Sequence, residues 1–127
     1  MTKEQKLFKS LILADLRLAE EHYSDDNKAI RLQAAYHAQQ AVEKTIKLKA
    51  ELAGGLPLWG HDIDVLLKKC EDNGINIDTP KYIRDKADAI THWEAECRYY
   101  PITIVRKDSI KKTIDAVREW LAQEDIK

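Results

Sequence analysis

The chain has 127 residues, of which 44% are hydrophobic and 34% are charged, and 21 basic side chains balance 22 acidic ones. This length predicts a single domain over residues 1–127, with a core that needs neither a metal nor disulfide bonds. A net charge of −1 argues against a globally basic surface for nucleic acid or anionic membrane. Only a local basic patch would then bind phosphate.

The composition also indicates the class of protein and its compartment. Four glycines and three prolines are too few for a turn-rich all-β chain or a disordered one. The only cysteines, Cys70 and Cys97, do not form a disulfide framework. The first residues lack the apolar core of a signal peptide, and no apolar run approaches the ~18–20 residues that span a bilayer. The sequence therefore predicts a soluble cytoplasmic protein.

The first predicted helix starts at Thr2, where Gln5 completes a capping-box pattern. Apolar side chains then recur at helical spacing on one predicted inward face: Phe8, Leu11, Ile12, Leu16, Ala19 and Tyr23. Asp15 lies within this apolar stripe. Because burying an unpaired carboxylate is costly, we expect Asp15 to have a partner or to lie at the edge of an interface.

The second predicted helix covers about residues 28–53 and ends at Gly54-Gly55. Its many alanines let another helix approach closely, as in the central helix of a bundle or in a dimer interface. Four polar side chains recur at steps of three and four residues beside the alanines: Gln40, Glu43, Lys44 and Lys47. They form either a solvated face with a Glu43–Lys47 ion pair or part of a ligand site.

Three further helices follow. One starts at His61-Asp62 and closes at Asn73-Gly74, and the next starts at Asp78-Thr79-Pro80. Tyr100 precedes a proline, so we expect the backbone to leave the helix there. Residues 102–105 are interpreted as an extended linker, and Asp108-Ser109 is expected to cap the last helix. The predicted fold is all-α, an up-and-down bundle of four long helices plus one shorter helix.

The candidate chemistry is limited. Glycine-rich nucleotide loops are absent, and His92 with Glu96 would give two metal ligands without a third, so we predict no metal and no cofactor. Cys70 and Cys97 fall on inward faces, where packing is their usual role. The segment Arg98-Tyr99-Tyr100-Pro101 places a guanidinium and two rings at a helix exit. This arrangement suits phosphate binding and base stacking, and equally suits closure of the bundle.

Four motifs, in order along the chain, resemble the HEPN domain family. They are Ala14-Asp15-Leu16-x-x-Ala19, the segment Tyr36-His37-Ala38-Gln39-Gln40-Ala41-Val42-Glu43-Lys44-x-Ile46-Lys47, His61-Asp62-Ile63-x-x-Leu66 and Arg98-Tyr99-x-Pro101. The resemblance implies a bundle of four or five helices that commonly forms dimers. It also makes Asp15 a feature of the family.

Many members of this family are metal-independent ribonucleases with an Arg-x4–6-His motif near the late helices. The matching arginine is Arg98, but Thr103, Ile104 and Val105 stand where histidine should follow. Arg17-x4-His22 and Arg31-x5-His37 have the spacing, yet they lie in the first two helices. The sequence therefore favours a protein without this activity.

Another branch of the family lacks the catalytic pair and resembles the substrate-binding subunit of a minimal nucleotidyltransferase, often in toxin–antitoxin-like modules. The leading hypothesis is thus a non-catalytic, homodimeric protein that acts with such a partner and binds a nucleotide or nucleotide-bearing substrate. Arg98 would contact phosphate, Tyr99 and Tyr100 would stack, and Lys44 and Lys47 would add positive charge. Gln40, Glu43 and Asp15 complete the candidate site.

Two alternatives remain open. One is a ribonuclease toxin with a divergent site, in which Arg98 works with His92 or with His37 from a second subunit. The other is a structural helical adaptor, for which Arg98 and Lys44 would have no role in binding.

Overall fold

The computed structural model describes residues 1–55, 57–100 and 104–123, and these ranges contain five α-helices and no β-strand. The helices are α1 (Lys3–His22), α2 (Lys28–Leu52), α3 (Ile63–Asp72), α4 (Lys81–Tyr99) and α5 (Lys107–Gln123). The predicted all-α class is confirmed. Four of these helices have 17 to 25 residues, and α3 has 10.

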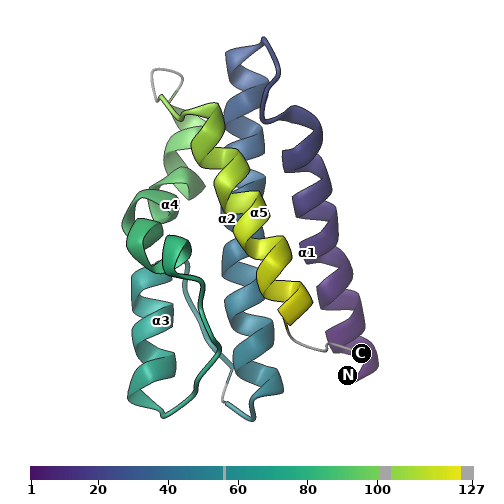
Figure 1. The fold of residues 1–127 in the computed structure, drawn as a ribbon, viewed down its shortest axis with the longest axis vertical. Helices are drawn as coiled ribbons and strands as arrows, with labels where there is room; N and C mark the ends of the chain where they lie inside the picture. Colours follow the sequence, from purple (N-terminus) through teal and green to yellow (C-terminus); the bar gives the residue numbers. More distant parts are fainter. Residues whose placement is uncertain (56, 101–103, 124–127) are drawn as a thin grey trace.

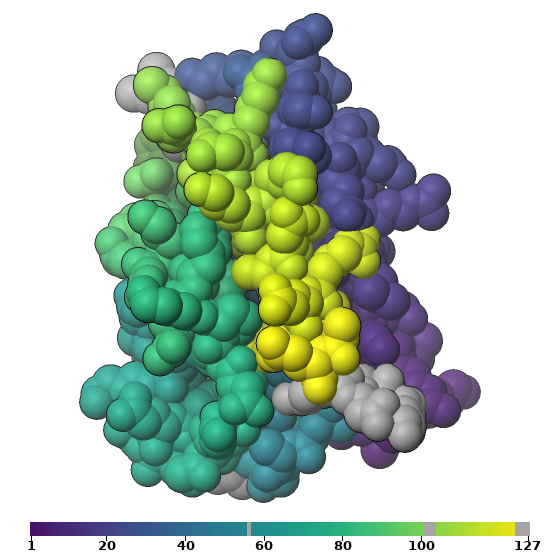
Figure 2. All heavy atoms as spheres, viewed as in Figure 1, coloured from purple at the N-terminus to yellow at the C-terminus, as the bar shows by residue number. Residues whose placement is uncertain are grey.

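Helix α2 is the central helix of the molecule, because it packs against each of the other four helices. In Figure 1, α1 lies on one side of it, α3 and α4 lie on the other, and α5 crosses in front. Figure 2 shows α5 filling the face between α1 and α4. The alanines predicted to allow close approach are buried along α2 at Ala34, Ala35, Ala38 and Ala41. Of the two interpretations of this alanine-rich helix, the central position in the bundle is the one observed.

Most predicted helix ends are confirmed by local hydrogen bonds. Thr2 and Gln5 form the reciprocal capping box at the start of α1. The Asp62 side chain accepts from the Val65 amide and caps α3, and Gly74 follows this helix with a φ of 68°. Tyr100 has extended backbone angles directly after α4.

Two predicted helix starts are wrong. Proline was expected at the first helical position, but Pro80 is itself the N-cap of α4, and its ring has no polar atom that could cap the helix. Asp78, two residues earlier, has a left-handed φ of 51°. Helix α5 begins at Lys107, so Asp108 lies in its first turn, where it accepts a hydrogen bond from Arg106. The predicted linker at 102–105 lies partly outside the described residues, and Ile104 and Val105 are not helical.

One predicted core position is also wrong. Leu11 was expected on the inward face of α1, but 53% of its surface is exposed. Ile12, Leu16 and Ala19 are fully buried, as predicted. Helix α1 packs mainly on α2, with a smaller contact to α5, so only a narrow strip of its surface is covered. The remaining leucines of this helix face outward.

Candidate functional site

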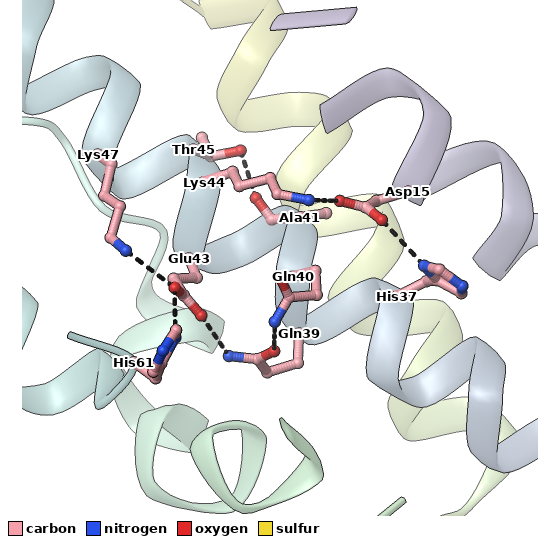
Figure 3. Close-up of polar contacts among 10 residues, drawn as sticks. All are labelled: Asp15, His37, Gln39, Gln40, Ala41, Glu43, Lys44, Thr45, Lys47 and His61. Carbon is pink, nitrogen blue, oxygen red and sulfur yellow. Dashed lines mark hydrogen bonds and ion pairs between the residues drawn. The ribbon is translucent and has the colours of Figure 1, made fainter. Parts of the chain in front are cut away.

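Asp15 is buried between α1 and α2 and has two partners. Its side chain is bound by His37 through Nδ1 at 2.9 Å and by Lys44 through Nζ at 2.6 Å (Figure 3). Both partners come from α2, two turns apart, so they approach the carboxylate from opposite sides. The expectation that Asp15 needs a partner is confirmed. The cluster neutralises a charge that would otherwise be costly inside an apolar interface.

A second cluster surrounds Glu43 on another side of α2. Its carboxylate accepts from Lys47 Nζ at 2.9 Å and from Gln39 Nε2 at 3.0 Å, and His61 Nδ1 lies 2.8 Å away (Figure 3). Gln40 extends the cluster by donating to Gln39 at 2.7 Å. The Glu43–Lys47 pair was predicted, but Glu43 is only 3% exposed and does not lie on a solvated face.

The protonation state of Glu43 follows from these contacts. Burial raises the pKa of its carboxyl, but hydrogen bonds from Lys47, Gln39 and His61, with the positive charge of Lys47, lower the pKa more. The net result is a pKa below the usual glutamate value of 4.5. Glu43 is therefore a carboxylate at neutral pH and anchors the imidazole of His61 just before α3.

Arg98 lies in the last turn of α4, where aromatic rings contact its guanidinium. The guanidinium carbon is 5.1 Å from the ring centre of Tyr36 and 5.0 Å from that of Tyr99. Nη1 also donates to Glu94 at 3.1 Å, an ion pair one turn back on the same helix. Tyr99 and Tyr100 are more than half exposed beside it. The end of α4, where a guanidinium and two aromatic rings were predicted to lie together, is thus accessible from solvent.

Tyr36 connects this exit to the Asp15 cluster. Its ring contacts Arg98 on one side and meets the His37 ring edge-to-face, with the two centres 5.3 Å apart. Contacts therefore run from α4 through α2 to α1 along Arg98, Tyr36, His37, Asp15 and Lys44. We call these five residues the polar row.

The predicted site residues thus divide into two groups. Arg98, Asp15 and Lys44 belong to the polar row, with Tyr99 and Tyr100 at its Arg98 end. Gln40, Glu43 and Lys47 belong to the second cluster around Glu43. The two groups share α2 but have separate partners.

The candidate set missed Tyr36, Gln39 and His61, and included His37 only as a base from a second subunit. The sequence contained a signal for His37 and for Gln39. His37 and Lys44 are seven residues apart and therefore share a face of one helix, and Gln39 stands four residues before Glu43. Nothing local in the sequence connects Tyr36 to Arg98 or Glu43 to His61.

The two Arg–His pairs with ribonuclease spacing have other partners. Arg17 pairs with Glu21 at 2.9 Å on the exposed side of α1. Arg31 donates to the backbone carbonyls of Asp25 and Asp26 at 2.6 and 2.9 Å, and so holds the turn between α1 and α2. Both arginines are accounted for by these local contacts.

The described ranges were also searched for a metal site, a membrane-spanning helix and a reactive cysteine. They contain no cluster of three or more metal-ligating side chains, and none of their helices is long and apolar enough to cross a membrane. Cys70 and Cys97 are buried, as predicted. Burial and the charge of Glu96 raise the pKa of Cys97 to about 12, so its thiol is not activated as a nucleophile.

A cavity among the described residues lies away from the polar row. It has a volume of about 510 Å³ and opens between the end of α3, the 74–79 loop and the start of α4. Its lining includes Leu67, Ile77 and Arg84. Arg98 lies at the opposite end of α4, so the cavity and the polar row are separate places.

Comparison with known proteins gives one match. The family model described as the HEPN domain matches residues 10–124. No curated protein and no solved structure gives a significant match. The matched segment runs from α1 to the end of α5, and it includes the whole polar row and the cluster around Glu43.

Proposed function

The chain belongs to the HEPN domain family, and from this premise we propose that it binds a nucleotide or a nucleotide-bearing substrate without cleaving it. The proposal has three further parts. The whole chain, residues 1–127, acts as one domain in which the four longer helices form an up-and-down bundle with α3 as the shorter addition. The protein is a homodimer in the cytoplasm. It works with a separate minimal nucleotidyltransferase, in a toxin–antitoxin-like module.

The observation that carries the proposal is the setting of Arg98. Two aromatic rings contact its guanidinium, and two exposed tyrosines stand at the same helix end. A phosphate pairs well with a planar guanidinium, and a base stacks on an exposed aromatic ring. The Glu94 partner is an exposed i,i+4 pair, worth at most about 1 kcal/mol, so a phosphate can displace it.

Binding without cleavage is favoured by the position of the nearest histidine in the polar row. Cleavage of RNA at the 2′-hydroxyl needs a general base within hydrogen-bond reach of the reacting group. Tyr36 stands between Arg98 and His37, and Nδ1 of His37 is engaged by Asp15. Lys44 and Lys47 are each paired with a carboxylate, so we assign them to holding the site together rather than to supplying net positive charge to a ligand.

Calorimetric titration with ATP tests ligand binding. The proposal expects a saturable interaction that Arg98→Ala weakens by about 10- to 100-fold, the usual loss for one charged hydrogen-bonding group. Arg84→Ala is the matched control, because Arg84 is also exposed on α4 but lies at its other end, and it should leave the affinity unchanged. Equal affinities for wild type and Arg98→Ala would refute the assignment.

Co-expression with the product of a neighbouring nucleotidyltransferase-like gene, followed by size-exclusion chromatography, tests the partner. The proposal expects the two chains to elute together. Persistent separation would rule out the partner and leave nucleotide binding to be judged on the calorimetry alone.

One observation favours the ribonuclease alternative. Asp15 and His37 form a carboxylate–histidine pair, the arrangement that orients an imidazole for proton transfer. Tyr36 is the one residue between this pair and Arg98, because its ring contacts both His37 and Arg98. This alternative expects metal-independent cleavage of RNA in the presence of a chelator, lost in both Arg98→Ala and His37→Ala. Intact RNA after prolonged incubation with purified protein would exclude it.

A further inference from the structure

A second place for a ligand lies at the far end of α4 from Arg98. The end of α3, the 74–79 loop and the start of α4 surround a cavity of about 510 Å³, which we call the α3–α4 cavity. Figure 1 shows this loop returning beside α3 from the lower end of that helix to the start of α4. The volume is within the range of about 300–1,000 Å³ that small-molecule sites have in proteins.

The loop that forms one wall of this cavity is held in place by the rest of the molecule. The carbonyl of Ile77 accepts a hydrogen bond at 2.7 Å from Nε1 of Trp120, which is fully buried. The amide of Ile75 donates at 2.8 Å to the carbonyl of Cys70 and so closes the turn after α3. A ligand therefore meets a wall that is already formed, and binding does not have to order the loop.

Three charged side chains line the cavity without pairing with one another. Glu71 belongs to the last turn of α3, Asp78 to the loop and Arg84 to the start of α4. All three are exposed, and within the described residues none of their side chains makes an ion pair or a hydrogen bond. A cation and two anions that share one cavity in this way are available to the two ends of a ligand.

The lining also contains apolar side chains. Leu67 and Ile75 are partly buried, and Ile77 and Cys70 are buried. Burial raises the pKa of the Cys70 thiol, so this side chain is uncharged at neutral pH. This part of the cavity suits the hydrocarbon group of a ligand.

These groups define the chemistry of the ligand. A guanidinium binds a carboxylate through paired hydrogen bonds, and a carboxylate accepts hydrogen bonds from an ammonium group. The start of α4 carries no side-chain cap, so the positive end of the helix dipole adds to the attraction of Arg84 for an anion. The carboxylates of Glu71 and Asp78 repel a polyphosphate, so ATP is not a ligand of this cavity.

We propose that the α3–α4 cavity binds a small zwitterion that carries an apolar side chain. Glu71 and Asp78 receive its ammonium group, Arg84 receives its carboxylate, and Leu67 and Ile77 contact its hydrocarbon. A free apolar amino acid and a short apolar peptide share this chemistry. The site has no residue in common with the polar row, so it goes beyond the proposed nucleotide binding and does not depend on it.

An NMR titration of the nitrogen-15-labelled protein locates the site and distinguishes the two sources of ligand. The probes are L-leucine, L-phenylalanine and L-leucyl-L-leucine. The proposal expects saturable shift changes at residues 70–79 and at Arg84, and the probe that binds most tightly identifies the source as amino acid or peptide. No change with any probe at millimolar concentration, or changes centred on Arg98, would overturn the proposal.

Modified ligands test the two charges separately. Acetylation of the amino group removes the ammonium charge, and amidation of the carboxyl group removes the carboxylate, while both leave the hydrocarbon intact. Each modified form of the best probe should bind at least about 10-fold more weakly, the usual loss for one charged hydrogen-bonding group. Undiminished binding of either form would contradict recognition of a zwitterion.

Variants assign the charges to residues. Arg84→Gln should weaken the best probe by about 10- to 100-fold, but should not further weaken its amidated form, which has no carboxylate to lose. Asp78→Asn should weaken the probe but not its acetylated form, and asparagine tolerates the left-handed φ of 51° at this position. The matched control is Lys86→Gln, an exposed position of α4 that does not line the cavity.

The results separate this inference from the proposed function. All three substitutions are at exposed positions, and circular dichroism would show that the variants remain helical. If Lys86→Gln weakened the probe as much as Arg84→Gln, the effect would be one of overall charge and the assigned site would be wrong. Nucleotide binding at Arg98 is judged by the calorimetry with ATP and stands or falls without this cavity.

Discussion

Two buried carboxylates, Asp15 and Glu43, organise the polar side chains in the middle of α2. Lys44 and Lys47 are three residues apart, yet one binds Asp15 and the other binds Glu43. The Glu43–Lys47 pair was predictable because both residues belong to one helix. His61 could not be assigned to Glu43 from the sequence, since the two meet only when the segment before α3 packs against α2.

Glu43 gives a prediction for acid stability. Its folded-state pKa lies below 4.5, so its contribution to the free energy of unfolding is complete above that pH and is lost as the pH falls through the lower, folded value. We expect Glu43→Gln to lower stability at pH 7 by about 1–3 kcal/mol and to make it less pH-dependent below pH 4.5. Urea denaturation between pH 3 and pH 7 measures both effects.

The control for this experiment is Glu119→Gln, because Glu119 is an exposed residue of α5. It should behave as the wild type at every pH. A Glu43→Gln protein with the wild-type pH profile would show that the carboxylate makes no net contribution to the folded state.

Asp15 gives a second prediction at this scale. Asp15→Asn keeps the size of the side chain but removes the charge that binds His37 and Lys44. Because Lys44 then lacks its counter-ion in a partly buried position, we expect a loss of about 1–3 kcal/mol in the free energy of unfolding. Asp64→Asn, on an exposed position of α3, should change it by less than about 0.5 kcal/mol. A neutral Asp15→Asn would contradict the assigned role.

At the scale of the helices, periodicity and capping residues predicted every helix and most of their ends. The two wrong starts have a common cause, since each assignment relied on a capping residue type alone. Proline was predicted at the first helical position of α4, but Pro80 stands at the N-cap, one residue before the helix, and offers no side-chain acceptor. Leu11 was assigned to the core because α1 has apolar residues on more than one face, and periodicity does not say which face meets α2.

A pair of threonines tests the assignment of the helix ends. Thr2 caps α1 through its side chain, whereas Thr79 precedes α4 and the α4 N-cap makes no side-chain hydrogen bond. We expect Thr2→Ala to lower the free energy of unfolding by about 1 kcal/mol, and Thr79→Ala by less than about 0.5 kcal/mol. Urea denaturation of the two variants would contradict the assignment if Thr79→Ala had the larger effect.

For the molecule as a whole, the α-helical class followed from the sequence, but the arrangement of the polar row did not. Arg98 and Tyr36 are separated by 61 intervening residues, and their contact depends on how α4 packs against α2. The resulting surface connects the exit of α4 to the α1–α2 interface.

The most direct test of ligand binding at Arg98 is a nitrogen-15 NMR titration of the protein with ATP. Binding at this site predicts that the largest backbone shift changes lie at Arg98, Tyr99 and Tyr100 and at Tyr36 on α2, and that the 74–79 loop is unaffected. Changes confined to the cavity lined by Leu67, Ile77 and Arg84, or no changes at saturating ATP, would contradict it.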